Sequence, residues 1–251
     1  MKEVLWCPAL ALDNAPEKQT WKNIGYFDPE PVLKDIILSR EKQADYLVCP
    51  AYNAYFKNTF IIRSPIDIVV RYEKNQDGTS TIKTDRHDQE FFEDMFNVRQ
   101  GQNSSYPMLS LNSFYLFLSN ESMILESIPA FFHSTTLLQN TRVIPGTFDI
   151  GKWWRPVDFS FEVLDETKPL VFKRGDPLFY VRLISNENIK LTRTEFSPEI
   201  KSAMYSCTGL KRFVPRASLE ENYEAAKSYL GYLKSKIFPK KSKCPFHFWK
   251  R

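Results

Sequence analysis

Short β-prone segments recur along this chain at intervals of roughly ten residues, and this spacing restricts the possible fold more than any other feature. The region from Ala44 to Ile184 is rich in β-branched and aromatic residues, with Pro and Gly between the segments. In "DFSFEV", Phe159, Phe161 and Val163 alternate with polar residues. Strict alternation is typical of a strand with one face in a core. Many short strands of this kind predict a β-sandwich or jelly roll.

Turn residues mark several of the connections between these strands. Asp77-Gly78 lies between two alternating runs and favours a type I′ hairpin turn. Gly175, Asp176 and Pro177 separate two short apolar runs. We expect Gly175 to adopt a positive φ there, because glycine carries no Cβ and Pro fixes the next part of the turn. The polar stretch 119–121 separates two further predicted strands.

Helical patterns occur near both ends of the chain. Apolar residues at helical spacing follow Pro31 and predict a short helix near residues 30–42. Ser218 and Glu221 have the spacing of a capping box, and an apolar face continues from Leu219 to Ile237. The sequence therefore predicts a mainly β, α+β fold: a β-sandwich or jelly roll with a short N-terminal helix and a C-terminal helix. The β domain would span 1–217, with the C-terminal helix and basic tail, 218–251, packed on it.

Charge is unevenly distributed along the chain. The net charge is +4, but residues from Lys201 onward hold 12 Lys+Arg against 3 Asp+Glu, whereas the first 200 hold 22 against 27. A basic end of this kind is either a solvated helix and tail or a contact surface for nucleic acid, an acidic protein or an anionic membrane. In the nucleic-acid alternative, cations would contact phosphates and aromatic rings would stack on bases. These residues are Lys211, Arg212, Arg216, Lys240, Lys241, Lys243, Phe246, Phe248 and Trp249.

Compartment signals favour a reducing location. No apolar run reaches the length of about 18 residues that a membrane span requires. The first apolar run is short and contains Glu3, which is untypical of a signal peptide. Four widely spaced cysteines do not resemble a disulfide framework. We expect the protein in the cytoplasm of a host cell or in a virion.

No complete catalytic motif occurs in the chain. It contains no P-loop, no G-x-G-x-x-G, no G-x-S-x-G and no Cys/His protease signature. The histidines are His87, His133 and His247. A cupin-like iron enzyme would use His87 and His133 with nearby carboxylates such as Glu90, although the usual His-x-Asp pair is absent. We therefore assign no catalytic residue, metal or cofactor.

The cysteines offer one further metal alternative. Cys7, Cys49 and Cys244 each precede proline, a dipeptide compatible with haem ligation. Cys244 and His247 have the spacing of half a zinc site, but the second close pair that such a site needs is missing. Free cysteines are the simpler interpretation.

The segment "FDIGKWWRPVDFSFEV" contains the strongest candidate contact residues. In a strand, only one of Trp153 and Trp154 would point inward, and an exposed indole beside Arg155 would suit stacking on a sugar, a base or a protein. In the alternative interpretation, the Trp pair fills the end of the sandwich. The predicted ligand- or partner-binding residues are Trp153, Trp154, Arg155, Arg174, Asp176, Lys240, Lys241, Lys243 and Trp249.

Two stretches carry a resemblance to a known group of proteins. "VIPGTFDIGKWWRPVDFSFEV…PLVFKRGDPLFYVRLI" and "VCPAYNAYFKNTFIIRSPIDIVV" resemble uncharacterised cupin-like, jelly-roll β proteins of tailed phages and bacteria. The likeness extends from Ala44 to Ile184 and implies a fold, but no catalytic residue. Together with the missing motifs, it predicts a non-enzymatic structural or interaction protein, such as a virion or assembly component, with protein partners or self-association. The alternatives are a cupin-like metal-dependent enzyme of the non-haem iron oxygenase type and a nucleic-acid-binding protein.

Overall fold

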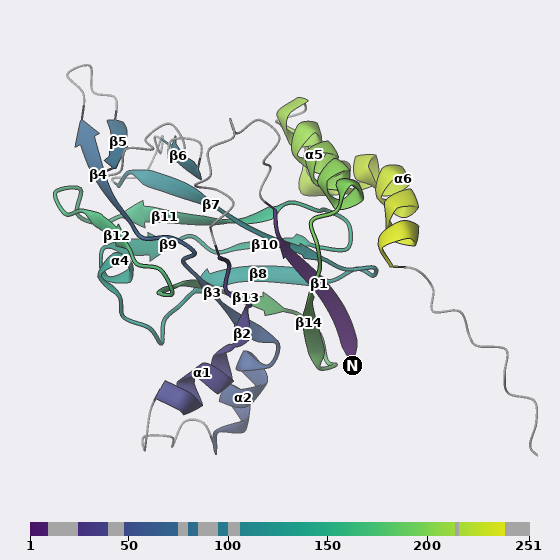
Figure 1. Ribbon diagram of the computed structural model, residues 1–251, viewed down its shortest axis with the longest axis horizontal. Helices are drawn as coiled ribbons and strands as arrows, with labels where there is room; N and C mark the ends of the chain where they lie inside the picture. Colours follow the sequence, from purple (N-terminus) through teal and green to yellow (C-terminus); the bar gives the residue numbers. More distant parts are fainter. Residues whose placement is uncertain are drawn as a thin grey trace, which may run out of the picture.

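The protein has a mainly β, sandwich-like α+β fold, as the sequence predicts. The structure is a computed structural model, and it describes residues 1–9, 25–39, 48–74, 80–84, 95–99, 106–213 and 216–238. Within these residues, the strands form three sheets that make up a central β body, with helices at its two ends (Figure 1).

The first sheet contains, in spatial order, β14 (Ile189–Arg193), β1 (Lys2–Pro8), β7 (Met108–Leu118), β11 (Pro156–Val163) and β9 (Thr141–Val143), with β6 (Phe96–Arg99) also paired to β7. β1 and β14 are parallel, whereas the other pairs in this sheet are antiparallel. The long strand β7 is central, because three neighbours pair along its two edges.

Two smaller sheets complete the β body. The second sheet has the order β10 (Gly146–Asp149), β8 (Ile124–Pro129), β13 (Pro177–Leu183), β3 (Thr59–Arg63) and β2 (Glu30–Pro31). The third has the order β12 (Leu170–Phe172), β4 (Ile68–Lys74) and β5 (Ser80–Thr84). β4 and β5 are the two strands of the predicted hairpin, and their Asp77-Gly78 turn lies outside the described residues.

Aromatic side chains join the sheets into one core. Phe159 of β11 stacks on Phe179 of β13, with ring centroids 5.5 Å apart and an interplanar angle of 8°. Phe161 lies 6.4 Å from Phe172 of β12, so the third sheet shares the same core. The predicted alternation in β11 is confirmed, because Phe159, Phe161 and Val163 are all buried. Burial of such rings is the main stabilising contribution to a fold of this kind.

The predicted Gly175 turn is confirmed, since its φ is +88°. The two strands beside it do not pair with each other: β12 belongs to the third sheet and β13 to the second. The connection at residues 119–121 likewise takes the chain from β7 in the first sheet to β8 in the second. Turn residues thus predicted where strands end, but not which sheet the next strand enters.

The predicted helices are α1 (Val32–Ser39) and α6 (Leu219–Ile237), and both are confirmed. The Ser218 hydroxyl accepts from the Glu221 N–H and the Glu221 carboxylate accepts from the Ser218 N–H, which completes the capping box. The structure adds α5 (Pro198–Phe213), which packs against α6, and the short α4 (Thr136–Gln139). In Figure 1, α1 and α2 (Pro50–Phe56) lie at one end of the β body, and α5 and α6 at another.

One prediction of secondary structure is wrong. Residues Pro50–Phe56 form helix α2, although their aromatic content indicated a strand. Pro50 occupies the first turn, where its missing N–H costs no hydrogen bond. Tyr52 and Phe56 are then one helical turn apart, with ring centroids 4.6 Å apart, and Phe56 is buried in a small core beside α1. Tertiary packing therefore overrides the strand propensity of these residues.

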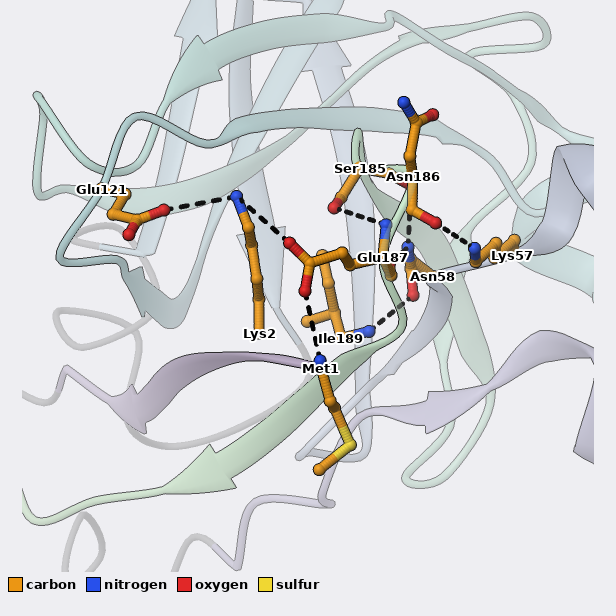
Figure 2. A network of polar contacts seen from close by, with 9 residues as sticks. All are labelled: Met1, Lys2, Lys57, Asn58, Glu121, Ser185, Asn186, Glu187 and Ile189. Atoms are coloured by element: carbon orange, nitrogen blue, oxygen red, sulfur yellow. Dashed lines mark hydrogen bonds and ion pairs between the residues drawn. The ribbon is translucent and has the colours of Figure 1, made fainter.

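Asn58 connects α2 and β3 to the loop between β13 and β14 (Figure 2). Its φ is 57°, in the left-handed region that Asn tolerates better than most residues. Its side-chain amide donates to the carbonyls of Ser185 (3.3 Å) and Glu187 (2.8 Å), and its side-chain oxygen accepts from the Ile189 N–H (2.9 Å). Asn58 therefore fixes the register at which β14 begins.

We expect Asn58→Ala to lower the free energy of unfolding by about 2–4 kcal/mol, because three hydrogen bonds are lost and Ala is strained at positive φ. Asn58→Gly, which removes only the hydrogen bonds, should cost less. Urea denaturation of the two variants measures both values. Equal midpoints for the wild type and both variants would contradict this role of Asn58.

Candidate ligand-binding cleft

A tight turn after β10 directs the chain toward the candidate site. The Asp149 carboxylate is buried and accepts hydrogen bonds from the Ser122 hydroxyl (2.5 Å) and from the N–H groups of Met123 (2.9 Å) and Gly151 (2.8 Å). The Asp149 carbonyl accepts from the N–H of Trp153 at 2.9 Å. These bonds reverse the chain within a few residues and fix the segment 153–155 that follows.

Both tryptophans of this segment are buried, so the alternative with one exposed indole is wrong, and the burial agrees with the other interpretation, in which the Trp pair fills space in the fold. Trp153 is 2% exposed and Trp154 is 0% exposed. The physical reason is that residues 152–155 are not in a strand, and their side chains are therefore not forced onto opposite faces. Trp153 lies 6.4 Å from the Tyr223 ring of α6, and Trp154 lies 6.5 Å from Phe238, measured between ring centroids. The pair fills space between the β body and α6.

Arg155 keeps its polar end accessible. Its side chain is 26% exposed, and its guanidinium carbon lies 5.3 Å from the centre of the Phe148 ring. The nearest acid is Asp158, with 3.7 Å between Nη2 and Oδ2, which is too long for a hydrogen bond. Within the part of the chain that the structure describes, Arg155 makes no hydrogen bond through its guanidinium. Arg155 is thus ion-paired with Asp158 and packed on the Phe148 ring, while part of its side chain stays accessible.

Two adjacent cavities meet at Arg155, and we call them together the Arg155 cleft. Trp153, Arg155 and Asp158 line both. The first cavity, the sheet lobe, has a volume of about 360 Å³ and is also lined by Ser127, Ile144, Pro145, Gly146, Thr147, Phe148, Val157, Ser160, Ala217, Leu219 and Asn222. The second, the helix lobe, has a volume of about 470 Å³ and is also lined by Ala9, Asn112, Phe114, Pro156, Met204, Tyr205, Thr208 and Gly209. Cavities of this size are typical of small-molecule sites.

A strained residue forms one wall of the helix lobe. Phe114 has a φ of 56°, an unfavourable value for a bulky residue, at a bulge where the pairing of β7 with β11 shifts register. The Asn112 side chain accepts from the Phe114 N–H (3.1 Å), and the Ser113 hydroxyl donates to the Val157 carbonyl. The bulge lets Phe114 line the helix lobe while Tyr115 is buried and stacks on Trp6, 5.6 Å away. Strain of this kind is often found at functional sites.

The other predicted contact residues lie elsewhere or outside the described residues. Arg174 and Asp176 are in the β12–β13 turn and do not line the cleft. The Arg174 guanidinium covers the Phe27 ring at 4.8 Å and donates to the Pro65 carbonyl, so it stabilises the turn. The predictions that fall outside the described residues concern His87, Glu90, Lys240, Lys241, Lys243, Cys244, Phe246, His247, Phe248 and Trp249.

His133 belongs to a polar network that joins α1 to the second sheet. Its Nε2 lies 2.8 Å from Asp35 Oδ2, and its Nδ1 lies 2.7 Å from the Tyr180 hydroxyl. Arg63 donates to the other Asp35 oxygen at 2.5 Å and to the Gly175 carbonyl at 2.9 Å. Burial raises the pKa of Tyr180, whose hydroxyl shares this hydrogen bond with Nδ1. Both imidazole nitrogens are thus used in holding α1.

The described residues supply no set of metal ligands for either the cupin-like iron site or the zinc site. His133 would have to leave Asp35 or Tyr180 in order to bind a metal. Across the described ranges, no three His, Cys, Asp or Glu side chains are grouped closely enough to hold an ion. None of the helices in these ranges is long and apolar enough to cross a membrane.

The cysteines differ sharply in exposure, and this yields a prediction. Burial raises the pKa of Cys7 to about 12 and that of Cys207 to about 11, whereas Cys49 is exposed. Since the thiolate is the reactive form, iodoacetamide at pH 8 should alkylate Cys49 at least about tenfold faster than Cys7 or Cys207 in the native protein. Mass spectrometry of the digested protein measures each rate, and equal rates before unfolding would contradict the buried placement.

The comparisons with known proteins add no family. No protein-family model matches the chain, and no curated protein matches it in sequence. Function is therefore argued from the geometry of the cleft.

Proposed function

We propose that this protein is a non-enzymatic interaction protein that recognises its ligand in the Arg155 cleft. The observation that carries the proposal is the half-buried Arg155 guanidinium, which faces two cavities and makes no hydrogen bond among the described residues. An arginine that borders a cavity can donate planar, charge-assisted hydrogen bonds to a ligand there. A ligand with acceptor oxygens that fills the cleft would use them.

The polar groups around the cleft favour binding over catalysis. The hydroxyls of Ser110 and Ser160 bond to each other at 2.9 Å, and the Ser127 hydroxyl accepts from the Gly146 N–H at 3.0 Å. A nucleophilic serine would instead need an adjacent base. The one described histidine, His133, contacts Asp35 and Tyr180 and does not line the cleft. These arrangements support holding a ligand without transforming it.

The resemblance to β proteins of phages and bacteria supports a second part of the proposal. In this part, the protein is an assembly or virion component, and its basic C-terminal segment contacts a protein partner. The proposed location is the host cytoplasm or the virion.

A thermal-shift screen with organic acids, amines, sugars and nucleotides tests the proposal. We expect at least one class of compound to raise the melting temperature of the wild type but not that of Arg155→Gln. Mass spectrometry should recover the bound compound unchanged after long incubation. Recovery of a reaction product, stabilisation that is equal in Arg155→Gln, or the lack of any stabilising compound would each contradict the proposed function.

A further inference from the structure

We propose that the ligand of the Arg155 cleft is a small organic anion with an apolar body: its carboxylate or sulfonate binds the Arg155 guanidinium, and its apolar part lies in the helix lobe. This inference rests on the proposed function and names the class of ligand. Three features of the cleft support it, namely the guanidinium, the strained aromatic wall and an open glycine face.

The guanidinium supplies the anion site. Arginine presents planar, fixed donors that match the two oxygens of a carboxylate, and such charge-assisted bonds are stronger than neutral ones. Phe148 lies against the guanidinium and Asp158 stays at 3.7 Å, so the two neighbours orient it without occupying its donors. Asp158 is 31% exposed and competes weakly for the same cation. A cationic ligand would instead bind beside Asp158. Removing the charge of Asp158 or of Arg155 therefore has opposite effects on anionic and cationic ligands, and this difference can be measured.

The helix lobe supplies the apolar site. Phe114, Pro156 and Met204 form much of its wall, with Trp153 at the boundary between the two lobes. Phe114 has a backbone conformation that Asn or Gly would adopt at lower cost, and its partly buried ring packs against the main core while it also lines the lobe. The apolar body of a ligand in this lobe would therefore contact the Phe114 ring.

Gly209 leaves one side of the lobe open. It lies within helix α5 and lines the lobe, and a Cβ placed there would meet nothing within 4 Å. Glycine within a helix is unfavourable by about 1 kcal/mol relative to Ala, and no packing requirement in the described residues offsets that cost. A larger side chain at this position would enter the lobe and exclude the ligand. Gly231 of α6 is the matched control, because its Cβ would also meet nothing and it does not line the cleft.

Fluorescence titration with two related dyes tests the inference on the full chain. Anilinonaphthalene sulfonate carries an anionic group, and phenylnaphthylamine has the same ring system without it. In Arg155→Gln, we expect the dissociation constant of the anionic dye to rise at least about tenfold and that of the neutral dye to change less than about twofold. Lys190→Gln, with the same charge change at an exposed position on β14, should leave both constants unchanged.

Three further variants, and Gly231→Leu as a control, test the helix lobe and the sign of the ligand charge. Gly209→Leu should raise the dissociation constants of both dyes at least about fivefold, whereas Gly231→Leu should change neither constant. Phe114→Asn should weaken the binding of both dyes, and its loss of core packing should be partly offset because Asn tolerates the positive φ. Asp158→Asn should strengthen binding of the anionic dye. Circular dichroism confirms that each variant is folded.

Three results would overturn the inference. They are a wild type that does not bind the anionic dye, an Arg155→Gln variant that binds both dyes with wild-type dissociation constants, and an Asp158→Asn variant that binds the anionic dye more weakly. Each of these results leaves the proposed function standing when the thermal-shift screen finds sugars whose stabilising effect depends on Arg155. Failure of that screen alone would remove the proposed function together with the inference.

Discussion

Gly151→Ala is expected to lower the free energy of unfolding by at least about 4 kcal/mol, a large part of the 5–15 kcal/mol typical of a native protein. A Cβ at this position would lie 1.9 Å from the Glu121 carbonyl oxygen and 2.9 Å from the Ser122 nitrogen. Both atoms belong to the backbone, so no side chain can rotate to relieve the clash. The requirement is one of space, since Gly151 does not have a positive φ.

Neighbouring contacts prevent the backbone from moving aside. Ser122 and Met123 are bonded to the Asp149 carboxylate, and the Ile150 N–H donates to the Met123 carbonyl at 2.9 Å. Gly209→Ala is the control: its Cβ meets nothing, and it should raise stability by up to about 1 kcal/mol. Thermal denaturation should place the Gly151→Ala midpoint about 10 °C or more below that of the wild type. A midpoint within about 2 °C of the wild type would contradict the packing described here.

Asp149→Ala is expected to cost about 4 kcal/mol, for a different reason. The change leaves the buried N–H groups of Met123 and Gly151 without their shared acceptor, and the exposed Ser122 hydroxyl also loses its bond. Each buried donor without a partner costs about 1–3 kcal/mol. Because the turn positions segment 153–155, binding of the anionic dye should weaken in any Asp149→Ala protein that remains folded.

Asp165→Ala is the control for the Asp149 prediction. Asp165 accepts a similar pair of local bonds, from the N–H (3.0 Å) and the hydroxyl (2.6 Å) of Thr167, but it lies at the surface. Water replaces those bonds when the carboxylate is removed, so the loss of stability should be small. Comparable losses in the two variants, measured by urea denaturation, would show that burial of Asp149 does not set the cost.

Much of the fold was predictable because local signals coincide with tertiary structure. The alternation of Phe159, Phe161 and Val163, the capping box at Ser218 and the positive φ of Gly175 all depend on residues close in sequence. The assignment of strands to sheets was not predictable, since the turn at Gly175 is compatible with a hairpin or with a change of sheet. Helix α2 was mispredicted because the packing of Phe56 beside α1 overrides local propensity.

The site was predictable only in part. Trp153 and Arg155 were identified from their sequence context, and both line the cleft. Phe114 gave no local signal, because a positive φ for Phe arises from the bulge opposite β11 and the side chains that hold it. Asp158 looked like an ordinary outward-facing residue of a strand. Its role depends on the cavity that α5 and the preceding turn create beside it.

The central claim is that Arg155 is the anion-binding residue of the cleft, and nuclear magnetic resonance of isotopically labelled arginine side chains tests it most directly. The Arg155 Nε–H signal is assigned by its loss in Arg155→Gln and followed during titration with the anionic dye. We predict a saturable shift of this signal with the same dissociation constant as the fluorescence titration. The signals of Arg174 and of Arg182, which is bonded to Glu126 and does not line the cleft, should move little. A stationary Arg155 signal while the dye binds would contradict the claim.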